Sequence, residues 1–82
     1  MQNKKPLNDK GLAYGLWEVY HHNGKLWLKG TYLNGKRHGF FEEYYHNGKT
    51  YYKGSYLNGK YIGFWIFYYY SSSIKQIRFY AR

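Results

Sequence analysis

The sequence predicts an all-β protein: a single-layer, curved antiparallel meander of about six strands. Three observations indicate this fold. The tripeptide Asn-Gly-Lys occurs four times and uses four of the ten glycines. Between these tripeptides lie short runs rich in Tyr, Phe and Trp, the residue types that favour strands. Apolar and polar residues alternate in these runs, and no segment shows the 3.6-residue period of an amphipathic helix.

Asn-Gly between two alternating runs is the strongest short-range signal for a β-hairpin, because both residues tolerate the positive φ of a type I′ turn. We therefore expect two-residue turns at 23–24, 34–35, 47–48 and 58–59. Together with the serines at 71–73, these turns delimit strands near residues 13–22, 25–33, 36–46, 49–57, 60–70 and 74–81.

The turns belong to a longer repeat. Residues 15–38 align without gaps on residues 39–62, and fourteen of the 24 positions are identical. Residues 63–82 form a degenerate third copy, as expected of a repeat that caps an array. We expect one repeat domain over residues 11–82, preceded by a flexible basic leader of residues 1–10.

Two-residue turns fix the register of each hairpin. In the first hairpin, Trp17 is then opposite Gly30, Glu18 opposite Lys29, and Tyr20 opposite Trp27. An aromatic ring over a cross-strand glycine covers exposed backbone, so we expect the Trp17 ring to cover Gly30. The second hairpin repeats these pairs as Phe41–Gly54, Glu42–Lys53 and Tyr44–Tyr51.

The same register sorts side chains onto two faces. One face is apolar and carries Trp17, Phe41 and Trp65, which we expect to form a stripe that contacts a protein partner or a second copy. The other face combines lysines with aromatic rings. We expect it to bind a partner or nucleic acid through Lys25, Lys29, Lys49, Lys53, Tyr20, Trp27, Tyr44 and Tyr51.

Composition narrows the classes of function. The chain of 82 residues has thirteen Lys and Arg against four Asp and Glu, a net charge of +9 that suits an anionic partner. It has no cysteine, which excludes disulfides and zinc–thiolate sites. A polar N-terminus without a signal peptide predicts a cytoplasmic location.

The titratable residues predict neither catalysis nor a cofactor. Glu42 and His46 share a face at a spacing that would suit an acid–base pair. His46 also occupies the same repeat position as His22. A histidine that recurs at one position of a repeat is explained more simply by a structural role in the repeat than by a single catalytic site. The remaining histidines, His21 and His38, do not cluster with them, so we expect no metal site and no enzyme activity.

The pattern G-x-W/F-E-x-Y-x-x-N-G-K followed by K-G-x-Y-x-N-G-K resembles the MORN repeat (membrane occupation and recognition nexus). It is most similar to the bacterial variant in proteins described as antitoxins of toxin–antitoxin pairs. The resemblance covers residues 15–62 well and residues 63–82 in part. It implies stacked hairpins in one curved sheet, and a role in lipid binding, scaffolding or partner binding.

These observations favour a non-catalytic inhibitor, of the antitoxin, immunity or mobile-element anti-defence kind, that docks on a nuclease or ribonucleoprotein. The first alternative is direct, sequence-nonspecific binding of RNA or single-stranded DNA, in which lysines contact phosphates and rings stack on bases. The second alternative is a module that works at a membrane surface or in a scaffold.

Overall fold

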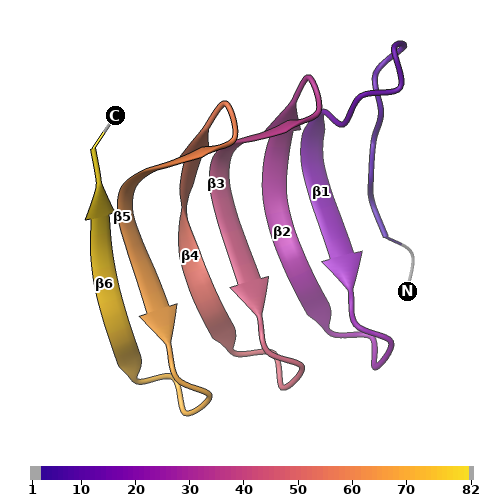
Figure 1. The fold of residues 1–82 in the computed structure, drawn as a ribbon. Coiled ribbons are helices and arrows are strands. Elements are labelled where there is room, and N and C mark those ends of the chain that lie inside the picture. Colours follow the sequence, from indigo (N-terminus) through magenta and orange to yellow (C-terminus); the bar gives the residue numbers. More distant parts are fainter. Residues whose placement is uncertain (1–2, 82) are drawn as a thin grey trace.

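A computed structural model describes residues 3–81 as one six-stranded antiparallel sheet with no helix in that range (Figure 1). The strands follow one another in space as they do in sequence, which confirms the predicted meander. They are β1 (Gly15–Tyr20), β2 (Leu26–Leu33), β3 (Lys36–Tyr44), β4 (Thr50–Leu57), β5 (Lys60–Tyr68) and β6 (Ile74–Tyr80).

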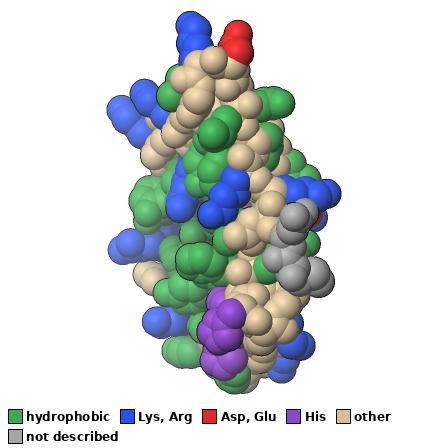
Figure 2. Space-filling view, turned by 90° about the vertical axis from the view of Figure 1, so that its right-hand side faces the viewer, with side chains coloured by type: hydrophobic (Ala, Val, Ile, Leu, Met, Phe, Trp, Pro, Cys, Tyr) green, Lys and Arg blue, Asp and Glu red, His purple; other side chains and the backbone are tan. Residues whose placement is uncertain are grey.

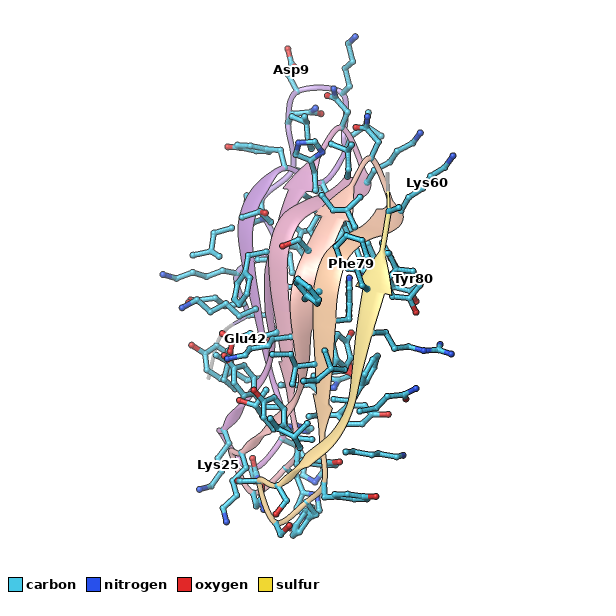
Figure 3. The ribbon with its side chains drawn as sticks, turned by 90° about the vertical axis from the view of Figure 1, so that its left-hand side faces the viewer. Asp9, Lys25, Glu42, Lys60, Phe79 and Tyr80 are labelled. Carbon is cyan, nitrogen blue, oxygen red and sulfur yellow. The ribbon has the colours of Figure 1, made fainter. Side chains whose placement is uncertain are left out.

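The sheet is a single layer. Its Cα atoms span 41 × 36 × 10 Å, so nothing in the described chain packs on either face as a second layer. We name the two sides by their residues. The core face carries Trp17, Tyr32, Phe41, Tyr56, Trp65 and Tyr80; the outer face carries Leu16, Lys29, Phe40, Lys53, Phe64 and Phe79. Seen edge-on from β6, the neighbours Phe79 and Tyr80 point to opposite sides (Figure 3).

The predicted register holds in the middle of the hairpins. Trp17 pairs with Gly30 and Glu18 with Lys29 in the first hairpin, and Phe41 with Gly54 in the second. The register fails near one end of the sheet, where a bulge places Tyr20 opposite Leu26 rather than Trp27. The second hairpin shows the same shift, with Tyr44 opposite Thr50 rather than Tyr51.

The four Asn-Gly-Lys tripeptides form two kinds of turn. At 34–35 and 58–59 the asparagine and the glycine both have positive φ, and the flanking residues pair directly, as a two-residue type I′ turn requires. At 23–24 only Gly24 has positive φ, and the amide of His21 donates to the carbonyl of Lys25. This is a three-residue loop with a glycine bulge.

The two-residue turns expected at 23–24 and 47–48 are therefore wrong. The tripeptide does not distinguish the two geometries, because Asn-Gly fits the last two positions of the three-residue loop as well as it fits a type I′ turn. In these loops the asparagine side chain accepts a hydrogen bond from the amide of the following lysine, at 2.9 Å in both. The loop at 69–73 has the same backbone hydrogen bonds.

Glycines at the start of each repeat bend the sheet. Gly15, Gly39 and Gly63 have φ of 70°, 101° and 71°, values that other residues rarely adopt. Two of them adjoin register shifts between neighbouring strands. Such bulges increase local twist and turn a flat sheet into a curved one, which accounts for the bend of β3 and β5 near their first residues (Figure 1).

Residues 3–6 of the leader lie along the outer edge of β1, an arrangement that the sequence pattern did not predict. Lys4 and Glu18 exchange two backbone hydrogen bonds of 2.7 and 2.9 Å, and their side chains form an ion pair at 3.7 Å. The carbonyl of Pro6 accepts from the Trp17 indole N–H at 3.1 Å. A lysine and a proline at this position cover the N-terminal edge of the sheet.

Candidate functional site

The core face is a continuous network of aromatic rings. Tyr32, Phe41, Tyr56 and Trp65 meet edge to face, with centroids 5.0–5.4 Å apart and interplanar angles of 75–82°. Tyr61 adds a further edge-to-face contact to Trp65 at 4.7 Å. Phe41 is 0 % exposed and Trp65 is 2 % exposed, although no second layer covers them.

Glycines make this burial possible. A Cβ atom on Gly30 would overlap the Phe41 ring, and one on Gly54 would overlap the Trp65 ring. Each ring therefore lies flat on the backbone of the preceding strand, while its neighbours cover its edges. We expected Trp17 to cover Gly30 and Phe41 to cover Gly54, and that assignment is wrong. Each glycine has a ring on both flanking strands, and the ring on the following strand covers it.

The predicted interface stripe of Trp17, Phe41 and Trp65 does lie on one face. Phe41 and Trp65 are already buried by the chain itself, so these two rings present no open surface to a partner. Trp17 is half-buried, and its ring contacts Tyr32 at 4.8 Å. The stripe therefore acts mainly as the hydrophobic core of the sheet.

One cation and one acid lie within this aromatic surface. The Arg37 guanidinium is 4.9 Å from the centre of the Phe41 ring and donates to the Tyr56 hydroxyl at 3.0 Å. Burial disfavours its charge, but hydrogen bonds to Tyr56 and Tyr32 outweigh that effect and raise its pKa. Burial raises the pKa of Glu43, although the charges of Arg37 and His21 oppose the shift.

Burial also raises the pKa of Tyr52 to about 12, with Glu43 and Tyr56 adding to the effect. The core face is therefore a largely apolar environment in which Arg37 is retained as a stacked, hydrogen-bonded cation.

The lysines and aromatic residues that we expected together on one basic face do not all lie on the same face of the sheet. Lys29 and Lys53 lie on the outer face, and the Tyr44 hydroxyl donates to the outer-face Glu42 at 2.9 Å. Burial raises the pKa of that tyrosine, and the bond to Glu42 adds to the shift. Tyr20 holds the position equivalent to Tyr44 in the first repeat. These four residues keep the predicted arrangement.

Trp27 and Tyr51 do not keep the predicted arrangement on the outer face. The Tyr51 ring lies 5.4 Å from Tyr52, which packs against the core. Trp27 contacts His21 at 5.7 Å. The two bulges turn these rings toward the core face, which periodicity alone did not predict.

The predicted charge pairs are in register but do not form ion pairs. Among the described residues, the ion pair of Glu18 is with Lys4, and Glu42 is bonded to Tyr44. Lys and Arg side chains are visible on both sides of the sheet when it is seen from the β1 edge (Figure 2). The net charge of +9 is thus distributed over both faces rather than collected on one.

An exposed apolar patch on the outer face emerges only in the structure. Phe64 and Phe79 are paired across β5 and β6 with ring centroids 4.8 Å apart, and they are 67 % and 63 % exposed. Beside them, Ile66 pairs with Ile77. We define the apolar patch as Phe40, Ile62, Phe64, Ile66, Ile77 and Phe79. The signal in the sequence was the run Phe-Trp-Ile-Phe at 64–67 in the third repeat, which is apolar at successive positions and therefore places apolar side chains on both faces.

Three of the four histidines contact the next hairpin along the chain. The imidazole of His21 is 3.2 Å from the carbonyl of Tyr44, and Nδ1 of His38 accepts from the amide of Asn58 at 3.2 Å. His46 contacts the ring of Tyr70. Between residues 3 and 81 no group of three or more His, Asp or Glu is placed to hold a metal ion, and no helix could span a membrane.

Comparisons of this chain with protein-family models, with curated proteins and with solved structures find no match. The geometry described above is therefore the basis for assigning a function.

Proposed function

We propose that this protein is a non-catalytic binding protein of the inhibitor kind, which docks on a protein such as a nuclease or ribonucleoprotein. The observation that carries the proposal is the apolar patch on the outer face, where Phe64 and Phe79 are 67 % and 63 % exposed. A contiguous apolar patch of this kind on a small soluble domain marks an interaction surface.

The surroundings of the patch favour a partner of particular chemistry. Lys53 lies beside it on the same face, paired with Ile66, and Lys29 lies two strands further along. Interfaces commonly combine an apolar, aromatic centre with a charged rim. A partner with an apolar centre and an acidic or phosphate-bearing rim would complement this face and would associate rapidly with a chain of charge +9.

We also propose that the hairpins are of the MORN type. The 24-residue period supports this, because each repeat places a left-handed glycine at its start and an aromatic ring two residues later. The antitoxin, immunity or anti-defence role suggested by that resemblance remains part of the proposal.

Direct binding of single-stranded nucleic acid is the second candidate, and one observation favours it. Tyr44 and Tyr68 lie on the outer face with Lys29 and Lys53, and Nζ of Lys53 is 5.9 Å from the Tyr68 ring centre. Rings interleaved with lysines are how single-strand binders hold bases and phosphates.

The test is affinity capture from cells with matched surface variants. Phe64→Ser with Phe79→Ser removes the centre of the patch. Leu16→Ser changes an apolar residue that is 44 % exposed on the same face near the opposite edge. We expect wild type and Leu16→Ser to retain the same protein after ribonuclease treatment, and the double variant to lose at least tenfold of it. Equal capture by all three, or capture that ribonuclease abolishes, would contradict a protein-docking patch.

A further inference from the structure

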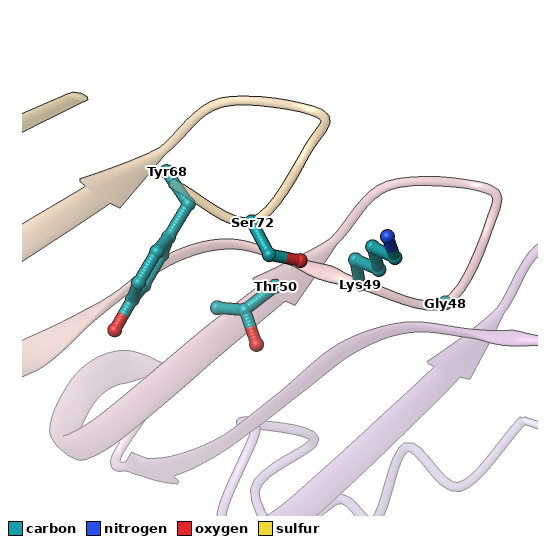
Figure 4. Close-up of a pocket in the computed structure, with 5 residues that line it drawn as sticks. All are labelled: Gly48, Lys49, Thr50, Tyr68 and Ser72. Atoms are coloured by element: carbon teal, nitrogen blue, oxygen red, sulfur yellow. The ribbon is translucent and has the colours of Figure 1, made fainter. Parts of the chain in front are cut away.

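A polar hollow lies between two neighbouring loops at the end of the sheet. Its volume is about 330 Å³, and it is lined by Gly48, Lys49, Thr50, Tyr68 and Ser72 (Figure 4). The first three residues come from the loop between β3 and β4 and the start of β4. The others come from the end of β5 and the loop that follows it.

The lining consists of hydrogen-bond donors and positive charge. Lys49 carries an ammonium group, and Thr50 and Ser72 carry hydroxyls, while the Tyr68 ring forms a side of the hollow with its hydroxyl directed away from Ser72 and Lys49 (Figure 4). The side chain of Lys25 lies against Gly48 on one side of the hollow, and Lys53 lies against Tyr68 on the other. No acidic residue is among the lining residues. We propose that this hollow binds a phosphate group of single-stranded nucleic acid, since lysine and hydroxyl donors form charge-assisted hydrogen bonds to phosphate oxygens.

Backbone strain at Ser72 points to the same site. Its φ is 81°, in the left-handed region, whereas the equivalent positions of the other two loops are Gly24 and Gly48. A non-glycine residue in this conformation is strained, and such strain clusters at functional sites. The hydroxyls on either side, of Ser71 and Ser73, hydrogen-bond to each other, while the Ser72 side chain lines the hollow.

The junction between the first two hairpins is an internal comparison. The residues there that correspond to the lining are Gly24, Lys25, Leu26, Tyr44 and Gly48. The lysine and the tyrosine are the same, but Leu26 replaces Thr50 and Gly48 replaces Ser72. Both side-chain changes remove a hydroxyl. Apart from the shared tyrosine, the second of these two junctions therefore has a lysine and two hydroxyl-bearing residues at the lining positions, whereas the first has the lysine alone.

The surroundings favour nucleic acid as the source of the phosphate. Tyr68 forms one wall, and Tyr44 holds the equivalent position two strands away on the same face, so rings adjoin the phosphate site as in single-strand binders. The loop tips beside the hollow carry Asn47, Gly48 and serines rather than aliphatic side chains that would enter a bilayer. Tyr69 and Tyr70 of the same loop are 52 % and 50 % exposed, and the Tyr70 ring packs on Tyr45 at 5.1 Å. The site is separate from the apolar patch and does not depend on it.

The experiment follows amide resonances of the intact protein during titration with inorganic phosphate, and measures binding of a labelled short oligouridylate. Ser72→Gly restores the glycine of the other loops, and Lys49→Gln removes the ammonium. Lys60→Gln is the matched control, because Lys60 also follows Asn-Gly but lies at the opposite end of the sheet from these loops (Figure 3 shows Lys25 and Lys60 at the two ends).

We expect phosphate to shift the amides of residues 48–50 and 72, and wild type to bind the oligouridylate. Ser72→Gly should raise the melting temperature by relieving strain and still weaken oligouridylate binding about three- to tenfold, the contribution of one hydrogen bond. Lys49→Gln should weaken it at least as much, and Lys60→Gln clearly less.

Three results would overturn the proposal. Equal losses from Lys49→Gln and Lys60→Gln would show diffuse electrostatic attraction without a site. Unchanged oligouridylate binding by Ser72→Gly would show that the hollow does not take part in binding the oligouridylate. Binding to vesicles of anionic lipid without binding to the oligouridylate would assign the phosphate to a membrane. None of these results bears on protein capture through the apolar patch, so failure of one proposal is distinguishable from failure of the other.

Discussion

On the core face Phe41 and Trp65 are 0 % and 2 % exposed, whereas on the outer face Phe64 and Phe79 are 67 % and 63 % exposed. Both faces belong to the same single-layer sheet, and each repeat contributes aromatic rings to both of them. The difference lies beneath the rings. Phe41 and Trp65 rest on Gly30 and Gly54, while Phe64 and Phe79 rest on each other.

The comparison shows how a single-layer sheet can form a core. Because glycine has no Cβ, an aromatic ring can pack directly on the strand backbone at that position. Neighbouring rings that meet it edge to face then cover its edges, so the ring is removed from water without a second layer. Where the sequence supplies no glycine, the ring stands above the sheet and remains available to a partner. The core face therefore stabilises the fold, and the outer face is the surface that we propose to bind.

The largest expected effect is a difference between two phenylalanines. Phe41→Ala removes a fully buried ring and should lower the free energy of unfolding by about 3–5 kcal/mol. Phe64→Ala removes an exposed ring whose main contact is Phe79, and should cost about 1 kcal/mol or less. Chemical denaturation of the two variants measures both values. Equal costs would abolish the distinction between the faces.

A smaller effect is expected at the glycine under Trp65. Gly54→Ala places a Cβ where the indole lies, so the ring must shift, and we expect a loss of about 1–3 kcal/mol in the free energy of unfolding. Ser55→Ala changes the next residue, whose side chain lies on the outer face, and serves as the control. A Gly54→Ala variant with a melting temperature equal to that of wild type would show that the ring does not rest on this glycine.

The smallest effect concerns the acid on the core face. Burial raises the pKa of Glu43, so on a rise in pH the unfolded chain releases this proton before the folded chain does. The stability that the protonated carboxyl contributes is present at low pH and is lost as pH rises above about 4.5. We expect Glu43→Gln to melt above wild type at pH 7 and the difference to vanish below about pH 4.

Glu42→Gln is the matched control for that measurement. It makes the same change at the neighbouring residue on the outer face, where the carboxylate accepts from Tyr44, and it should not stabilise the protein. A Glu43→Gln variant that is less stable than wild type at pH 7 would instead indicate that the carboxylate supports Arg37.

Much of this arrangement could be predicted from the sequence. Alternation and the repeat predicted the six strands, the pairing of Trp17 with Gly30 and the type I′ turns at 34–35 and 58–59. The three-residue loops could not be predicted, since the same Asn-Gly satisfies both turn types, and their bulges move Trp27 and Tyr51 to the core face. Pairing also could not decide which ring covers Gly30, because rings flank it on both sides.

The candidate sites were harder to predict for the same reason. Alternation in the sequence assigned three lysines to one face: Lys25, Lys49 and Lys53. It could not predict the hollow, because the hollow depends on how two loops with bulges lie against each other. The contributions of Thr50 and Ser72 follow from that packing. The apolar patch could have been predicted only from the run at 64–67, which is apolar on both faces and does not alternate like the corresponding strands of the other repeats.

The most direct test of the account is exposure of the aromatic rings to a soluble paramagnetic probe, measured in one NMR spectrum of the intact protein. We expect strong attenuation of the ring signals of Phe64 and Phe79, and protection of those of Phe41 and Trp65. Equal attenuation of all four rings would show that the core face is open, and protection of all four would show that the outer face is covered. Either result would contradict a sheet with one face closed by its own rings and the other free for a partner.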